Sequence, residues 1–187
     1  MVIEEGIAQA PFKISRRRWK RLLAELVRRG EDRRESGAFL LSDREANTVT
    51  AIAFYDDSDG ECLTGGISFA SSGFTELWGI CRTRNLRVVA DIHTHPSRWV
   101  MQSEIDATNP MIARVGHVAI IVPDYGRAGS LQDCGAHIYL GSRQWQRVPA
   151  DRIVSVVRVY DMFSRTQLAE WATGFPRRIR QMLGNQK

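Results

Sequence analysis

Two histidines separated by a single residue, His93 and His95, are the clearest candidates for chemistry in this chain. They end an apolar run that starts near residue 86 and predicts a strand, and alternate residues of a strand project from the same face. Both imidazoles can therefore reach one ion. Imidazole nitrogens suit zinc at about 2.0–2.1 Å, and a catalytic zinc commonly has three protein ligands and leaves a fourth position for water or substrate.

A carboxylate that follows the histidines, Asp106, is the natural third ligand. If Ser103 begins a helix, Ser103 and Asp106 face the same way, because residues three apart are neighbours on a helix surface. A hydroxyl then lies beside the metal-binding carboxylate, where it is available to an oxyanion. The segment from Ser103 to Asp106 also fits a capping box, which needs no metal.

With an upstream glutamate, these residues resemble the signature of the JAMM metalloprotease family, also called JAB or MPN+. The signature is a distant Glu, then H-x-H-P, six or seven further residues, and S-x-x-D. The chain supplies Glu35, His93, His95, Pro96, Ser103 and Asp106, with six residues between Pro96 and Ser103. A chance match has a probability of roughly one in 10^5 for a chain of this length. The resemblance covers about residues 11–140, and the insertion-poor form is similar to the bacterial, deubiquitinase-like (Prok-JAB) branch.

The resemblance implies a role for each matching residue. His93, His95 and Asp106 would bind one Zn²⁺ per chain, Glu35 would act as general base and acid, and Ser103 would help to stabilise the tetrahedral intermediate. The acids Glu31, Asp32 and Glu45 lie near Glu35 in the sequence, but only Glu35 directly precedes a short apolar strand.

The resemblance also implies a substrate. Enzymes of this kind hydrolyse the peptide or isopeptide bond after the C-terminal tail of a ubiquitin-like protein. Their bacterial relatives occur beside E1- and E2-like conjugation proteins, including in antiviral (antiphage) defence operons. The expected partners are therefore a ubiquitin-like protein, its conjugates and such conjugation proteins.

Substrate contacts are expected at two places near the ligands. A substrate tail could lie along residues 62–69 as an added strand, with Gly65 and Gly66 allowing close approach. Trp99 and Met101 fall in the loop between the metal ligands, where exposed side chains would border the cleft. The two other histidines, His117 and His137, lie in predicted strands and are expected to be structural.

The elements that must position these residues mix strands and helices. Ser15 can cap a helix whose apolar residues follow helical spacing until Gly30. The sequence predicts a hairpin at 36–41 and 48–55, a strand at 61–69, a helix at 71–85, and strands at 86–93, 117–122, 135–140 and 144–148. The fold class is α/β (α+β), with a mixed central sheet flanked by helices. The resemblance implies the cytidine-deaminase-like JAB/MPN fold.

The chain is expected to divide into a JAB/MPN metalloprotease domain, residues 1–148, and a helical C-terminal extension, residues 149–187. Apolar residues between 151 and 173 keep helical spacing, and Gly174 with Pro176 supplies a stop signal. Three valines and an isoleucine within this segment make a strand the competing interpretation for 153–159.

The charge admits other interpretations. The net charge of +5 comes from 23 arginines and 3 lysines, with arginines gathered near both ends. Such a field can attract nucleic acid or an acidic protein, but acids interspersed in the first helix favour a solvated face, and no aromatic residues alternate with the arginines.

The alternatives to a metalloprotease are a non-catalytic MPN-type scaffold and a nucleic-acid-associated protein similar to RadC. That branch typically has Asn where this chain has Thr94. Cytidine deaminase chemistry is excluded, because its H-x-E and P-C-x-x-C motifs are absent.

The remaining features predict a cytoplasmic protein that does not enter a membrane. The longest apolar stretch, near 115–123, is far shorter than the roughly 20 residues of a membrane span. The N-terminus carries two acids where a signal peptide would be positively charged. Cys62, Cys81 and Cys134 are odd in number and widely spaced, which indicates reduced thiols.

Overall fold

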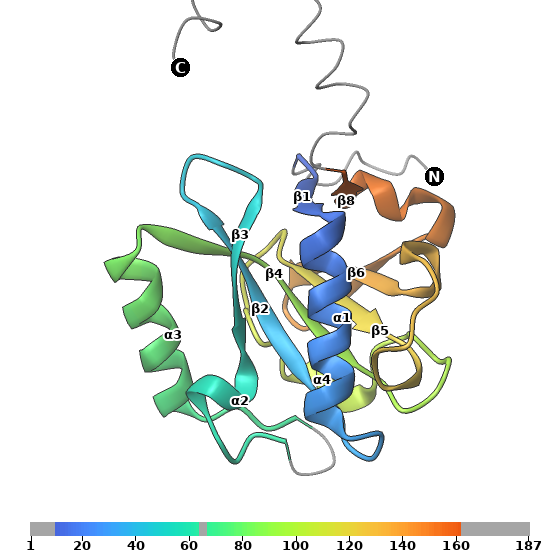
Figure 1. Cartoon of the computed structure of the whole chain (residues 1–187), viewed down its shortest axis with the longest axis horizontal. Coiled ribbons are helices and arrows are strands. Elements are labelled where there is room, and N and C mark those ends of the chain that lie inside the picture. The colour runs from blue at the N-terminus through green and yellow to red at the C-terminus, as the bar shows by residue number, and fades with distance from the viewer. Residues whose placement is uncertain (1–9, 64–66, 162–187) are drawn as a thin grey trace, which may run out of the picture.

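The computed structural model describes residues 10–63 and 67–161. Six strands form one mixed sheet in the order β3-β2-β4-β5-β6-β7 (Figure 1). These strands are β2 (Gly37–Asp43), β3 (Val49–Phe54), β4 (Leu86–Thr94), β5 (Val118–Val122), β6 (Gly135–Gly141) and β7 (Gln144–Val148). Only β4 and β5 run parallel, while the other neighbours are antiparallel. The predicted fold class, a mixed sheet flanked by helices, is confirmed.

Two long helices cover the sheet, and each has a core of its own. Helix α1 (Arg16–Gly30) packs Leu22 and Leu26 against one face, with Leu40 of β2 in the same core. Helix α3 (Ser71–Thr83) packs Leu77 against the other core, which contains Leu41. Neighbouring residues of β2 therefore enter opposite cores. Strands buried on both faces read as continuous apolar runs, which explains the composition of β2 and β4.

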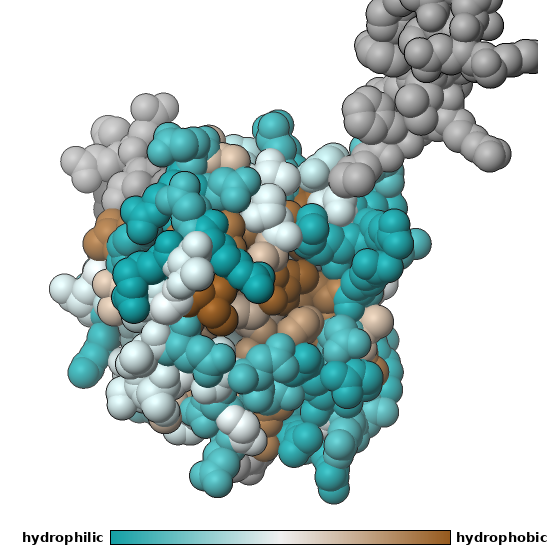
Figure 2. Space-filling view, turned by 60° about the vertical axis from the view of Figure 1, so that its left-hand side comes forward, coloured by the Kyte–Doolittle hydropathy of each residue, from teal (hydrophilic) through white to brown (hydrophobic). Residues whose placement is uncertain are grey.

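Shorter elements join these layers. They are β1 (Phe12–Ser15), α2 (Tyr55–Ser58), α4 (Glu104–Thr108), β8 (Val157–Tyr160), and the 3-10 helices η1 (Asp124–Gly126), η2 (Leu131–Asp133) and η3 (Ala150–Ser155). Seen from the side of α3 and β3, the surface is mostly hydrophilic and apolar side chains gather in one hollow (Figure 2). Within the described ranges, no helix is both long enough and apolar enough to span a bilayer.

The first helix begins and ends where the sequence predicts. The Ser15 hydroxyl accepts a hydrogen bond from the Arg18 amide at 3.3 Å, and the last helical residue is Gly30. Glu31 follows in the left-handed conformation, with φ of 51°, and its amide donates to the Val27 carbonyl at 3.1 Å. These bonds satisfy backbone groups that a helix terminus otherwise leaves unpaired.

The predicted strand at 61–69 is not found in the part of that segment that the structure describes. A single bridge joins Leu63 and Ile67, and Gly65 and Gly66 lie outside the described residues. The Asp59 carboxylate instead accepts hydrogen bonds from the amides of Glu61 and Ala70, at 3.3 and 2.8 Å. Local bonds to a side chain compete with strand pairing, so the β-forming composition did not produce a strand here.

The helix predicted over 151–173 is wrong for residues 156–160, while residues 151–155 lie in a short 3-10 helix. That segment contains the short helix η3 and then β8, whose residues pair in parallel with β1, with Phe12 opposite Val157. The competing strand interpretation of 153–159 is therefore correct for 157–159, because β1 offers a strand edge and the β-branched residues Val156 and Val157 are buried in the core under α1. Residues 162–187 lie outside the described part, and the division at 148/149 stays a prediction.

Candidate metal centre

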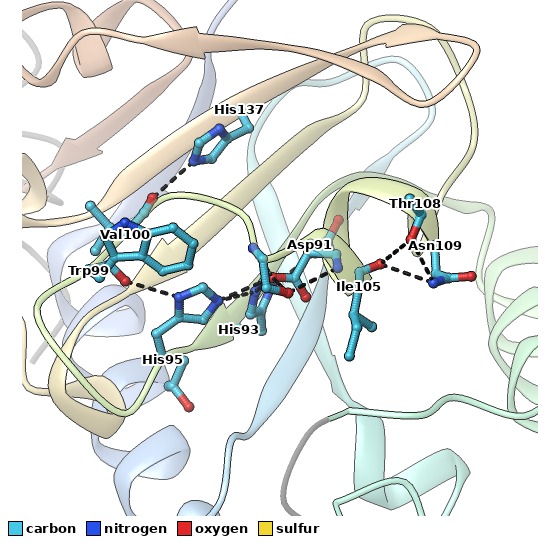
Figure 3. A network of polar contacts seen from close by, with 12 residues as sticks. Asp91, His93, His95, Trp99, Val100, Ile105, Thr108, Asn109 and His137 are labelled. Atoms are coloured by element: carbon cyan, nitrogen blue, oxygen red, sulfur yellow. Dashed lines mark hydrogen bonds and ion pairs between the residues drawn. The ribbon is translucent and has the colours of Figure 1, made fainter.

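Three side chains converge where β4 ends, as the sequence predicts. His93 and His95 are buried at the end of β4 (Figure 3), and Asp106, in α4, is half-buried. The two histidine Nε2 atoms are 3.3 Å apart, and Asp106 Oδ2 lies 3.3 Å from His95 Nε2 and 3.8 Å from His93 Nε2. Within the described ranges, these residues form the one cluster whose ligand atoms could hold a metal ion.

The spacing of these three atoms fits a tetrahedral zinc ion. Metal–ligand bonds of about 2.0–2.1 Å at tetrahedral angles place neighbouring ligand atoms about 3.3–3.4 Å apart. Two of the three separations have this length, and the third is slightly longer. Two imidazoles and one carboxylate are also a usual donor set for a catalytic zinc site with one open position.

The other nitrogen of each histidine faces an acceptor. His95 Nδ1 lies 3.0 Å from the Trp99 carbonyl oxygen, which can only accept, so Nδ1 carries the hydrogen. His93 Nδ1 lies 3.9 Å from Asp91 Oδ2. In the neutral histidines this arrangement leaves both Nε2 atoms unprotonated and facing Asp106, as ligation requires.

Backbone bonds hold the histidines on both sides of β4. The Thr94 amide donates to the Ser36 carbonyl of the neighbouring chain segment, and the His95 amide donates to Val122 of β5, both at 2.9 Å. The His95 carbonyl in turn accepts from the Tyr125 amide at 2.8 Å. The ligands therefore extend from a central strand with fixed neighbours.

Asp106 is oriented by the capping box that the sequence predicts. Its Oδ2 accepts hydrogen bonds from the Ser103 amide at 2.8 Å and from the Ser103 hydroxyl at 2.7 Å, and its amide donates back to Ser103 Oγ at 3.1 Å. The indole of Trp145 holds the same helix from β7 by donating to the Ala107 carbonyl at 3.1 Å. The Ser103 hydroxyl hydrogen is thus directed at Asp106, and its predicted role toward an oxyanion stays a prediction.

Glu35 lies half-buried directly before β2, at the same end of the sheet. Gly37 pairs with His93 across β2 and β4, and the Ser36 amide donates to the Thr94 hydroxyl at 2.9 Å. Burial raises the pKa of the Glu35 carboxyl, the charges of His93 and His95 oppose this rise, and the Asp106 carboxylate adds to it. Glu35 therefore feels the charges of all three candidate ligands, while its role as base stays a prediction.

The cluster has strong internal electrostatics. Burial alone would lower the pKa of His93, but hydrogen bonding and the charges of Asp106 and Asp91 raise it to about 10. Burial alone would raise the pKa of Asp106, but its contacts with the two histidines and Ser103 hold it well below its usual range. The site thus stabilises a positive charge between the carboxylates of Asp106 and Asp91. A proton on His93 can supply that charge, and a metal ion can displace the proton.

The loop between the ligands is anchored to β6. His137 Nε2 contacts the Val100 carbonyl oxygen at 3.0 Å, and a Cβ added to Gly135 would lie 2.0 Å from that oxygen. The Trp99 ring stacks on His95 at a centroid distance of 5.7 Å and remains 52% exposed, whereas Met101 is half-buried. The structural role expected for His137 agrees with this contact.

Sequence reasoning missed a buried group beneath His93. Asp91 accepts a hydrogen bond from His117 Nε2 at 2.5 Å and one from the Tyr55 hydroxyl at 3.3 Å. Burial would raise the pKa of Asp91, but the bond from His117 and the contact with His93 lower it to about 2. Strand alternation could have found Asp91, because it lies two residues before His93 and therefore on the same face.

Comparisons with known proteins bear on the fold. No protein-family model matches the chain. A solved structure of a Desulfitobacterium hafniense protein is 12% identical, with a TM-score of 0.54 over 82% of this chain and 95% of that chain. A Salinibacter ruber protein is 18% identical, with a TM-score of 0.52 over 79% and 91%. A JAB1/MPN domain protein from Archaeoglobus fulgidus is 20% identical, with a TM-score of 0.42 over 75% and 98%. The first two similarities indicate a shared fold alone.

Proposed function

We propose that this chain is a JAMM-type zinc hydrolase that cleaves the peptide or isopeptide bond after the C-terminal tail of a ubiquitin-like protein. The observation that carries the proposal is the tetrahedral spacing of the ligand atoms of His93, His95 and Asp106, in a chain whose residues match the JAMM pattern. Zinc, when bound, polarises a scissile carbonyl and makes its bound water more acidic.

Glu35 supplies the proton transfers in this proposal. Its carboxylate accepts a proton from the attacking water and returns one to the leaving amine, and its raised pKa brings both steps closer to neutral pH. Ser103 donates to the oxyanion after its hydroxyl turns away from Asp106, to which it is bonded in the structure. The chain thus provides a base and an electrophilic donor beside the metal ligands.

Substrate recognition is assigned to the rim of this site. Trp99 combines an exposed indole with a fixed position over His95, so it can contact the residues that flank the scissile bond. Met101 follows it in the same loop. Contact of a substrate tail with Gly65 and Gly66 belongs to the proposal, as do a cytoplasmic location and E1- or E2-like partners.

The pairing of the arginines weighs against the nucleic-acid alternative. Arg29 contacts Asp56 and Asp57 at 2.5 and 2.7 Å, and Arg28 contacts Glu25 at 2.8 Å. The two arginines near the C-terminal end of α1 therefore each have a carboxylate beside them, which weakens the field that would attract a phosphate backbone there. The presence of all three ligand residues, His93, His95 and Asp106, also argues against the alternative of a non-catalytic scaffold that has lost its metal.

The test is cleavage of defined substrates by the purified chain. Ubiquitin-fold proteins that carry C-terminal extensions or lysine-linked cargo are incubated with the wild type, and the products are read as intact masses. Cleavage after the tail should fall by about 10²–10⁴-fold in Glu35→Gln, because general acid–base catalysis contributes that much, while zinc content stays constant. The exposed acid Glu45, changed to Gln, is the matched control. Full turnover by Glu35→Gln would contradict the proposed mechanism.

A further inference from the structure

A buried carboxylate faces the first histidine ligand from inside the protein. Asp91 is 2% exposed, and it is surrounded by Tyr55 and His117, which are fully buried, and by His93. Its Oδ1 accepts from His117 Nε2 at 2.5 Å, while its Oδ2 accepts from the Tyr55 hydroxyl at 3.3 Å and lies 3.9 Å from His93 Nδ1. Burying a charged group is costly unless it is bonded, and His117 and Tyr55 supply these bonds to Asp91.

The orientation of His117 is set by what its two nitrogens meet. Its Nε2 contacts a carboxylate, which accepts, so Nε2 carries the hydrogen. Its Nδ1 is buried and has no hydrogen-bond partner among the described residues, which suits a bare nitrogen better than an N–H group. His117 therefore directs one donor at Asp91 and leaves the second carboxylate oxygen facing His93.

The two histidine ligands are supported in different ways. His95 Nδ1 bonds to the backbone carbonyl of Trp99 at 3.0 Å. His93 Nδ1 faces a side chain, Asp91, at 3.9 Å, an ion-pair separation rather than a hydrogen bond. Ligating histidines usually donate this second N–H to an acceptor, which fixes the tautomer and the ring orientation.

We propose that Asp91 and His117 form a positioning pair for His93. The negative charge of Asp91 attracts the Nδ1–H of His93 and so favours the tautomer whose Nε2 is free to bind the metal, and His117 holds Asp91 in place. The proposal rests on the proposed function only in requiring that the site binds a metal ion. It assigns Asp91 and His117 no contact with substrate.

The experiment compares metal binding by full-length variants, without substrate. Zinc affinity is measured by competition with a chromophoric chelator, and the visible spectrum of the Co²⁺-loaded protein reports the ligand field. We expect Asp91→Asn to bind zinc about 10–100-fold more weakly, because His117 and His93 face different oxygens of Asp91 and an amide replaces one of these acceptors by an NH2 donor. His117→Phe should also weaken binding and alter the Co²⁺ spectrum, whereas His117→Gln, which keeps a donor near the Nε2 position, should restore both.

Ile92→Val is the control that distinguishes a loss of protein stability from a loss of His93 positioning. This side chain lies between Asp91 and His93 in sequence, but it faces the core under α1, so the substitution loosens packing without touching His93. Thermal unfolding of the metal-free variants ranks their stability, and Ile92→Val should retain wild-type zinc affinity and spectrum.

The outcomes distinguish this inference from the proposed function. Wild-type zinc affinity in folded Asp91→Asn and His117→Phe would overturn the positioning pair and leave the proposed function standing. A wild-type protein that binds no zinc would overturn both. If Asp91→Asn is not recovered folded, the comparison between His117→Phe and His117→Gln decides, and equal affinity and equal spectra in those two variants would overturn the inference.

Discussion

Two segments of this chain share the pattern S-x-x-D and the same local structure, but only one of them lies at the metal centre. Ser103 and Asp106 form a capping box at α4, and Ser130 and Asp133 form one at η2. The serine amide donates to the aspartate at 2.8 Å in the first box and at 2.7 Å in the second. Only Asp106 also meets the histidines. The box is therefore a local feature, and its position in the fold decides whether the carboxylate faces the histidines of the candidate metal centre.

The largest expected difference between the two boxes is in catalysis. Ser103→Ala should lower the rate of substrate cleavage by about 10²–10³-fold if its hydroxyl stabilises the oxyanion. Ser130→Ala removes the same kind of cap, which costs about 1 kcal/mol of stability, and should leave the rate unchanged. Rates are compared at saturating zinc. Equal rates for the two variants would remove Ser103 from the catalytic residues.

Metal affinity should separate the two aspartates. Asp106→Asn replaces a charged ligand by a neutral one, so zinc affinity should fall by on the order of 100-fold or more, beyond the effect of losing a group that only supports a ligand. Asp133→Asn should bind zinc as the wild type does. Chelator competition on both variants makes the comparison, and a similar loss in both would show that the box rather than the ligand matters.

Protons should compete with zinc for His93, which faces the Asp106 carboxylate of the first box. The pKa of His93 is raised to about 10 and a bound imidazole must be neutral, so metal binding displaces one proton from His93 at any lower pH. Asp106, whose pKa is lowered, is already ionised near neutral pH and adds no proton. Apparent zinc affinity should therefore rise by up to about tenfold per pH unit between about pH 6 and 9. An affinity independent of pH would contradict this assignment.

The anchoring of the ligand loop should give the smallest effect. A Cβ at Gly135 would lie 2.0 Å from the Val100 carbonyl oxygen, so Gly135→Ala should displace the loop and cost about 1–3 kcal/mol of unfolding free energy. Gly79 lies in α3, and a Cβ added there meets no heavy atom within 4 Å. Gly79→Ala should instead stabilise the protein by about 0.5–1 kcal/mol. Denaturant unfolding of both variants checks the opposite signs.

Locally encoded features of the site were predicted well. Ser15 and Gly30 bound the first helix as expected, and the hairpin and the strand that carries His93 were found where the sequence predicts them. Each depends on side-chain period or on hydrogen bonds within a few residues. That His93 and His95 meet was predicted from strand periodicity, and that Asp106 joins them agrees with the spacing of the JAMM pattern.

Other features were left open or missed by the sequence analysis, because their partners are distant in sequence. Residues 157–160 form a strand since β1 offers them an edge, although their spacing fits a helix too. His117 reaches Asp91 because β5 runs parallel to β4, and nothing in the sequence near His117 indicates this pairing. The segment near Leu63 and Ile67 shows the opposite case, in which β-forming residues make a single bridge.

The sequence by itself determined the caps of the first helix, the run of the central strands, the capping box at Ser103 and the set of ligand types, because these depend on local residue patterns. Tertiary structure alone decided which S-x-x-D segment meets the histidines, which strand residues 157–160 join, and that His117 reaches Asp91 beside His93. Strand pairing and the meeting of side chains from separate elements depend on contacts across the fold, which local propensity does not encode.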